Sequence, residues 1–245
     1  MSKSVLSIED VDIFYGGFQA LETISLEIAS GDTFGLIGLN GAGKTTLIKA
    51  ILSLRDNNAG SIKVRGEPSF KASVKKHIAY LPERFNPPTF LRGMEFLHFS
   101  LSLYNKKMSD QEFCEAAENL ALNTDVLTKS VNTYSKGMRQ KLGLLGTLLT
   151  GCDLMILDEP MSGLDPRARA YVKDMLRQAK SDGRSIFLSS HILADMAEIC
   201  DHIAILHDKQ IQYDGTPKDL MTKTGKSDLE HAFLDIIEKE HPKAA

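Results

Sequence analysis

Short apolar runs recur along the chain and predict strands. Two of them, 153–157 and 185–189, are apolar without clean alternation, which is typical of parallel strands covered on both faces. A sheet built from such strands needs helices against each face. The predicted strands are VLSIE (5–9), ISLEI (24–28), TFGLI (33–37), SIKV (61–64), HIAYL (77–81), DLMIL (153–157), SIFLS (185–189) and HIAIL (202–206).

Apolar residues at helical spacing occupy the segments between these strands. From about 90 to 135 the pattern is all-helical, and we interpret this stretch as an insertion into one domain, 1–245, because a strand follows at 153. Residues 216–245 predict a helical C-terminal tail. Strands that alternate with helices predict an α/β fold with a mostly parallel sheet. The predicted helices cover residues 44–54, 110–122, 136–150, 167–181 and 191–199.

Composition and charge narrow the class of protein. Of 245 residues, 42% are hydrophobic and 25% charged, as in ordinary globular proteins. The net charge of −3 argues against bulk electrostatic binding to phosphates, so we expect no nucleic-acid partner. No apolar run approaches the roughly 18 to 20 residues that span a bilayer, and the opening residues lack a secretory pattern. Cys114, Cys152 and Cys200 lie far apart, which is typical of free thiols in a reducing compartment, so we expect a cytoplasmic protein.

A glycine-rich loop, GLNGAGKTT, separates the strand that ends at Ile37 from the following helix. It matches the pattern G-x-x-x-x-G-K-[ST], in which backbone N–H groups and the helix N-terminus surround phosphates. Lys44 is expected to bind the β- and γ-phosphates, and the Thr45 hydroxyl to bind Mg²⁺. A tight turn alone explains neither the lysine nor the hydroxyl. The predicted nucleoside triphosphate site comprises Gly38, Leu39, Asn40, Gly41, Ala42, Gly43, Lys44, Thr45 and Thr46.

Two carboxylates end the apolar strand in LMILDEP (154–160). Because a buried unpaired charge costs several kcal/mol, Asp158 and Glu159 need a functional reason or exposure to solvent. Asp158 is predicted to hold Mg²⁺, and Glu159 to polarise an attacking water as general base. The alternative is a solvent-exposed acidic turn capped by Pro160. His191 follows a predicted parallel strand, so it could meet Glu159 at one sheet edge, although a lone histidine is usually structural.

The segment YSKGMRQ (134–140) completes a set of motifs that resembles an ATP-binding cassette (ABC) ATPase. The resemblance extends over nearly all of residues 5–215, with the motifs in the family's order. FYGGFQAL resembles the aromatic loop, LPE the glutamine loop, SGLDP the D-loop and SSH the switch histidine. The positions that it marks are Tyr15 for stacking on adenine, Glu83 near the metal, Ser135 and Gly137 in the signature, Asp165 in the D-loop and His191 at the γ-phosphate.

The resemblance implies a P-loop NTPase core with a mostly parallel sheet, an N-terminal antiparallel β subdomain and a helical insertion. It implies ATP and Mg²⁺ as ligands, with Thr45, Glu83 and Asp158 at the metal and Glu159 and His191 as catalytic residues. Two copies, or one copy and a related cassette, would pair head-to-tail, with each ATP between one loop and the other's signature. The partner expected from similar signatures is an integral membrane permease, a separate chain of a prokaryotic exporter, with this chain peripheral on its cytoplasmic side.

Two motifs depart from the family's usual pattern. Glu83 stands where a glutamine is usual, which adds negative charge near the triphosphate. Tyr134, Lys136 and Met138 replace the leucine, glycine and glutamine of the common signature, LSGGQ. The segment ERFNPPTFLRGMEFLHF (83–99) holds several aromatics, which either pack the helical insertion or line a groove for a short helix of the permease.

Two other function classes remain as alternatives at this point. A soluble cassette ATPase acting on ribosomes or DNA typically carries two cassettes or a long coiled-coil insertion, whereas this sequence has one phosphate loop. A regulatory or scaffold protein with little turnover predicts loss of Glu159 or His191, and both are present. The sequence therefore favours the ATPase subunit of a transporter.

Overall fold

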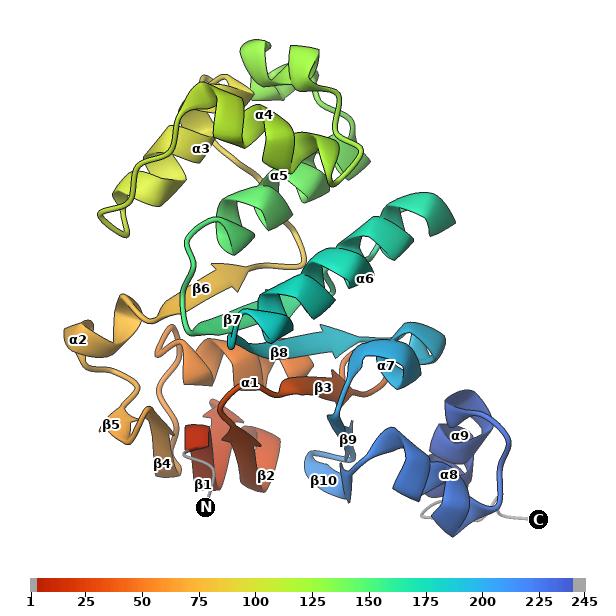
Figure 1. Cartoon of the computed structure of the whole chain (residues 1–245). Coiled ribbons are helices and arrows are strands. Elements are labelled where there is room, and N and C mark those ends of the chain that lie inside the picture. The colour runs from red at the N-terminus through yellow and green to blue at the C-terminus, as the bar shows by residue number, and fades with distance from the viewer. Residues whose placement is uncertain (1–3, 240–245) are drawn as a thin grey trace.

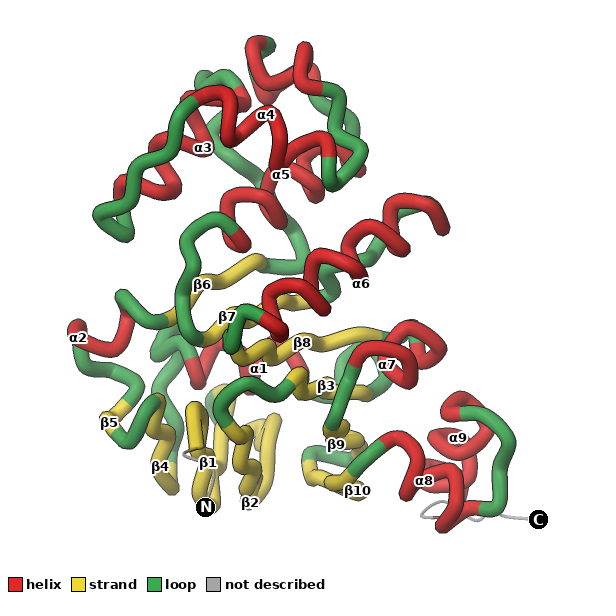
Figure 2. Tube along the Cα trace, in the orientation of Figure 1, coloured by secondary structure: helices red, strands yellow, loops and turns green. Residues whose placement is uncertain are grey.

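Two β-sheets and the helices around them build the protein, in a computed structural model that describes residues 4–239 (Figures 1 and 2). The N-terminal sheet has the order β2-β1-β4-β5 and is antiparallel. Its strands are β1 (Ser4–Tyr15), β2 (Phe18–Ala29), β4 (Ala59–Val64) and β5 (Glu67–Pro68). The second sheet has the order β10-β9-β3-β8-β7-β6. Its strands are β3 (Thr33–Ile37), β6 (Ile78–Leu81), β7 (Leu154–Asp158), β8 (Ser185–Ser190), β9 (His202–His207) and β10 (Gln210–Gly215).

The second sheet is parallel except at its β10 edge. Strands β9, β3, β8, β7 and β6 pair in parallel, whereas β10 pairs with β9 in the antiparallel sense. Every residue of β3, β7 and β8 is buried, as expected for central strands covered on both faces. The predicted fold class, a mostly parallel core sheet with an N-terminal antiparallel subdomain, is confirmed.

The side chains of the central strands alternate between two hydrophobic cores. In β7, Leu154 and Ile156 face the core that includes the N-terminal sheet, whereas Met155 and Leu157 face the opposite core. Alternate residues of a strand point to opposite faces of its sheet, so one short apolar run supplies both cores. The helix after the phosphate loop lies in the first core, between the two sheets, and the later helices of the chain cover the opposite face (Figure 1).

The helices fall into three groups. Helix α1 (Lys44–Ile51) lies between the sheets, and α2 (Ala72–Lys75) precedes β6. The all-helical stretch contains α3 (Gly93–Ser102), α4 (Asp110–Glu118) and 3-10 turns at Thr124–Thr128 and Val131–Thr133, and it leads into α5 (Lys136–Leu148). After β7 come α6 (Pro166–Ser181), α7 (Leu193–Ile199), α8 (Pro217–Thr224) and α9 (Leu229–Lys239). A bilayer-crossing helix is absent from residues 4–239, since none there combines the necessary length and apolar character.

Some elements differ from the expected ones. Strand β10 was not expected, because its sequence QIQYDG mixes polar and apolar residues and it pairs with β9 alone. Strand β1 continues to Tyr15 instead of ending at residue 9, through register shifts that interrupt its apolar alternation. The expected C-terminal tail contains α8 and α9, and its last part, 240–245, lies outside the described residues, as do residues 1–3.

Candidate active site

The glycine-rich loop joins the end of β3 to the start of α1 and requires glycine at two positions. Gly43 has φ 111°, in the left-handed region, and a Cβ there would lie 2.6 Å from Leu21 Cδ2. A Cβ on Gly38 would lie 2.6 Å from the carbonyl oxygen of Leu206. The loop therefore packs closely against β2 and β9, and its backbone rather than its side chains faces the space at the N-terminus of α1.

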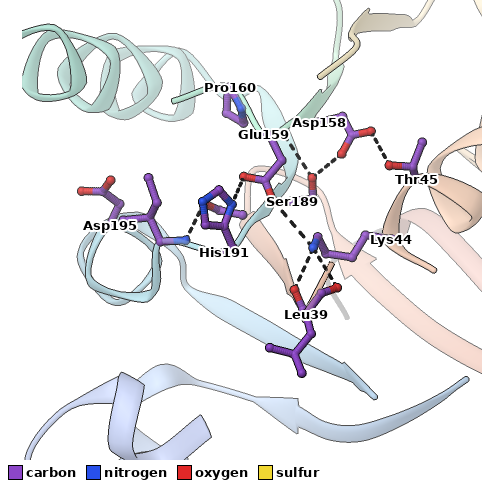
Figure 3. A network of polar contacts seen from close by, with 12 residues as sticks. Leu39, Lys44, Thr45, Asp158, Glu159, Pro160, Ser189, His191 and Asp195 are labelled. Atoms are coloured by element: carbon purple, nitrogen blue, oxygen red, sulfur yellow. Dashed lines mark hydrogen bonds and ion pairs between the residues drawn. The ribbon is translucent and has the colours of Figure 1, made fainter. Parts of the chain in front are cut away.

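The Lys44 ammonium lies over this loop, although its side chain is almost fully buried. Nζ donates hydrogen bonds to the carbonyl oxygens of Gly38 at 2.7 Å and Leu39 at 3.4 Å (Figure 3). It also lies 3.7 Å from Oε1 of Glu159. A buried cation held by carbonyl groups and one carboxylate is suited to bind a phosphate, because a charged oxygen is a stronger acceptor than a carbonyl.

Asp158 closes β7 beside the first turn of α1. Thr45 Oγ1 donates to Asp158 Oδ2 at 2.9 Å, and Ser189 Oγ donates to Oδ1 at 2.5 Å (Figure 3). Burial raises the pKa of Tyr80 to about 12, and the carboxylates of Asp158 and Glu83 add to that shift. The site thus holds hydroxyl and carboxylate oxygens and negative charge, which is the donor set that Mg²⁺ prefers.

Glu159 follows Asp158 with its carboxylate buried and its backbone in an unusual conformation. Its φ of 51° lies in the left-handed region, which costs a non-glycine residue about 1 to 3 kcal/mol. Its backbone N–H donates to Ser189 Oγ at 3.1 Å and to the Ser189 carbonyl at 3.2 Å. Oε2 lies 2.8 Å from Nδ1 of His191, whereas Oε1 has no hydrogen-bond partner within the described chain. The surrounding structure therefore holds a carboxylate oxygen free for a further proton donor.

Two neighbouring cavities contain most of the predicted site residues. The first, about 530 Å³, is lined by Leu39, Asn40, Gly41, Gly43, Lys44, Thr45, Thr46, Glu83, Arg84, Asp158, Glu159, Ser162 and His191. The second, about 700 Å³, is lined by Tyr15, Phe18, Ala20, Glu22, Leu39, Asn40, Gly41, Ala42, Gly43, Thr46, His207, Asp208 and Lys209. The glycine-rich loop forms a wall of both cavities, so one elongated ligand can follow the loop from one into the other.

Residues 21–162, more than half of the chain, match the family described as ABC transporter. The chain belongs to this family. It is 31% identical to AlbC of Bacillus subtilis, described as a putative ABC transporter ATP-binding protein, over 97% of this chain and 100% of AlbC. It is 39% identical to sll0415 of a Synechocystis species, described as an ABC transporter ATP-binding protein, over 77% of this chain.

A solved ABC transporter structure confirms the fold of this ABC family member. The structure is described as the ATP binding subunit of an ABC transporter, and it is 29% identical with a TM-score of 0.88. The match covers 95% of this chain and 99% of that one. By contrast, the chain spans 54% of the length of sll0415 and 61% of all4389 from Nostoc, which shares 36% identity.

The three ABC positions marked by the signature and the D-loop lie away from both cavities. Ser135 and Gly137, at the start of α5, line a separate cavity with Asp165, at the start of α6. Ser135 Oγ accepts from Met138 N at 3.2 Å, and Asp165 Oδ1 accepts from Ala168 N at 2.9 Å. The Ala168 N–H lowers the pKa of the Asp165 carboxyl. Within one chain, Ser135 and Asp165 therefore cap helices and do not contact the phosphate loop.

Three further site residues of this ABC protein were not among the predicted ones. Arg84 and Ser162 line the first cavity, and Ser189 binds both Asp158 and the backbone of Glu159. Ser189 acquires this role because β7 and β8 pair in parallel with Asp158 opposite Ser189. The available signal was a pair of serines that ends an otherwise apolar strand in SIFLSS.

Proposed function

We propose that this chain binds and hydrolyses ATP with Mg²⁺ and thereby drives a separate membrane permease. One observation carries the proposal: the Lys44 ammonium lies 3.7 Å from Glu159 Oε1, in a cavity that also contains Thr45 and Asp158. A cation for phosphate, oxygen ligands for a metal and a carboxylate for water are thus within one space. The relatives described above as ABC transporter ATP-binding proteins support this function over action on ribosomes or DNA.

The phosphates bind along the loop between α1 and β3. Lys44 exchanges its two carbonyl acceptors for oxygens of the β- and γ-phosphates, and the loop N–H groups and the N-terminus of α1 bind the remaining oxygens. Thr45, Asp158 and the carboxylate of Glu83 are the residues that would hold Mg²⁺. When bound, Mg²⁺ bridges the β- and γ-phosphate oxygens and neutralises the charge that develops on them.

Glu159 and His191 prepare the attacking water in this proposal. The free Oε1 of Glu159 accepts a proton from a water molecule that lies in line with the γ-phosphate. His191 holds the other carboxylate oxygen at 2.8 Å, and its exposed edge lines the cavity, from which it can donate to a γ-phosphate oxygen. Because the carboxylate lies on a strained, buried backbone anchored by Ser189, its position is fixed before substrate binds.

Hydrolysis further requires a second cassette, either another copy of this chain or a related one. Ser135, Gly137 and Asp165 line a cavity of their own, and none of them lines the cavity of the phosphate loop. A head-to-tail pair brings these residues of one copy to the γ-phosphate held by the other. ATP then binds the closed pair more tightly than the open one, and hydrolysis releases the pair.

The permease contacts the helical insertion through exposed aromatics in 83–99. Phe85 and Phe96 pack edge to face with ring centroids 5.4 Å apart, so they belong to the packing of the insertion. Phe90 and Phe99 are 83% and 48% exposed and are available to a partner helix. The chain is then peripheral on the cytoplasmic face of the membrane, export is the proposed direction, and the permease selects the cargo.

Equilibrium binding of ATP with Mg²⁺ to the wild type, Lys44→Ala and Lys49→Ala tests the proposal. Lys49 lies on the exposed side of the same helix and serves as the matched control. Loss of two charge-assisted phosphate contacts predicts at least about a 100-fold lower affinity for Lys44→Ala, and no change for Lys49→Ala. Equal affinity of all three proteins contradicts the proposed phosphate site.

A further inference from the structure

The loop after α1 returns to the end of β1, so one helix joins the phosphate loop to Tyr15. The N–H groups of Leu54 and Arg55 both donate to the carbonyl of Lys49, at 2.8 Å and 3.2 Å, which fixes the loop on the last turn of α1. Asn58 then bonds β1 twice, accepting from Phe14 N at 2.8 Å and donating from its own N–H to Asp12 at 2.8 Å. The strand end that carries Tyr15 is therefore attached to the helix that begins with the phosphate-binding lysine.

Arg55 lies directly behind Tyr15 in this junction. Its Cζ is 3.9 Å from the centroid of the Tyr15 ring, a stacked cation–π contact. Its Nη2 also donates to the carbonyl of Phe14, next to Tyr15 in the chain. Arg55 Nε is buried and has no hydrogen-bond partner among residues 4–239, so the guanidinium is held by the ring and by one carbonyl.

Tyr15 has one covered and one open side. The second cavity is lined by Tyr15 but not, among the described residues, by Arg55, so the guanidinium lies away from the cavity. The side of Tyr15 that faces the cavity is open, and the residue is 42% exposed. Tyr15 OH lies 3.4 Å from Thr46 Oγ1, which ties the free end of the ring to the phosphate loop.

We propose that Arg55 is a positioning residue that fixes the Tyr15 ring as the platform for the base of the bound nucleotide. This inference rests on the proposed function, since it concerns the base of the ATP whose phosphates bind at Lys44. An aromatic ring held from behind loses no side-chain freedom when a base stacks on it, and stacking on an aromatic contributes substantially to nucleotide affinity. Arg55 itself never touches the nucleotide.

The test separates base binding from phosphate binding. Affinities for ATP and for inorganic tripolyphosphate, each with Mg²⁺, are measured for the wild type, Arg55→Met and Lys223→Met. Lys223, whose Nζ lies 5.8 Å from the Tyr213 ring, is a matched cation–π control in α8. We expect Arg55→Met to lower ATP affinity about three- to tenfold and to leave tripolyphosphate affinity within about twofold, whereas Lys223→Met changes neither.

Two further variants show that the effect passes through Tyr15. In a Tyr15→Leu background, Arg55→Met is expected to cause no additional loss of ATP affinity, because the ring on which it acts is gone. Arg55→Lys keeps a cation and is expected to recover part of the loss. Arg55→Gln keeps a donor for the Phe14 carbonyl without the charge, and it replaces Arg55→Met if that variant fails to fold.

Each outcome of these measurements decides the inference. Equal losses for ATP and tripolyphosphate show that Arg55 supports the phosphate loop or the whole fold and overturn the inference. Unchanged ATP affinity, or a full additional loss in the Tyr15→Leu background, overturns it as well. If the wild type binds neither ligand, the proposed function itself fails; if it binds both and only the Arg55 effect is missing, the proposed function stands.

Discussion

Nδ1 of His191 lies 2.8 Å from Oε2 of Glu159, although 32 residues separate them in the chain. The contact exists because β7 and β8 are neighbouring parallel strands whose last residues, Asp158 and Ser189, pair directly. The carboxyl ends of parallel strands meet at one edge of a sheet, which is the usual place for ligands in such folds. The pair thus links the end of each strand to one reaction centre.

His191→Ala is predicted to reduce turnover while leaving ATP affinity within about threefold. The variant removes the hydrogen bond that orients Glu159, and such positioned proton-transfer groups contribute about 10²- to 10⁴-fold to rate. Steady-state ATPase assays and equilibrium binding measure the two effects. His202→Ala is the control, since His202 lies at the opposite end of the sheet, 3.5 Å from Asp32. Equal turnover of the two variants contradicts the role of His191.

Asp158→Asn is predicted to abolish the dependence of ATP binding on Mg²⁺. The wild type should lose affinity when EDTA removes the metal, whereas Asp158→Asn should bind ATP equally weakly with and without it, because an amide is a poorer Mg²⁺ ligand than a carboxylate. Asp153→Asn is the matched control at the start of the same strand, where Asp153 pairs with Arg65. A variant that responds to Mg²⁺ like the wild type excludes Asp158 as a metal-site residue.

Ser189→Ala is predicted to lower the free energy of unfolding by about 1 to 3 kcal/mol and to weaken Mg²⁺-dependent binding. Ser189 is fully buried, and its hydroxyl donates to Asp158 at 2.5 Å and accepts from Glu159 N at 3.1 Å. Its removal leaves a buried carboxylate oxygen without this donor. Urea unfolding and ATP titrations at several Mg²⁺ concentrations measure the two losses. Unchanged stability and metal dependence together refute the anchoring role.

Ser135→Arg is predicted to leave ATP binding by the single chain unchanged and to abolish hydrolysis. Ser135 does not line the phosphate-loop cavity, so a large side chain there obstructs only the approach of a second cassette. Gln111→Arg adds the same side chain on the exposed part of α4 and is the control. Binding titrations, ATPase assays and sedimentation with ATP compare them. Hydrolysis by Ser135→Arg at the wild-type rate rejects the composite site.

The site features that follow from local sequence were predictable, and those that follow from tertiary pairing were not. TFGLI predicts β3 at its observed bounds, and GLNGAGKTT follows it directly, because strand, loop and helix start are contiguous. Ser189 becomes a site residue only through the register of β7 with β8. Arg55 reaches Tyr15 across a long stretch of chain, and no local pattern indicates that contact. Strand β10 was missed because an edge strand need not be apolar.

The aromatic segment after Glu83 shows the same limit. Its composition left open whether the rings pack the insertion or face a partner, and the structure separates them residue by residue. Phe85 and Phe96 pack together, and a Cβ on Gly143 of α5 would lie 2.7 Å from the Phe85 ring. Phe90 and Phe99 remain exposed. Burial depends on the crossing of α3 and α5, which the sequence of either helix alone does not specify.

Glu159→Gln tests the central claim most directly, because it changes one carboxylate oxygen to an amide without changing the shape of the side chain. ATPase turnover, ATP affinity and sedimentation are measured on the same preparation with Mg²⁺. The account predicts turnover reduced at least about 100-fold, affinity within about threefold of the wild type, and a dimer that persists with ATP. Turnover at the wild-type rate contradicts the assignment of Glu159 as general base, and loss of ATP binding contradicts the separation of its role from that of Lys44.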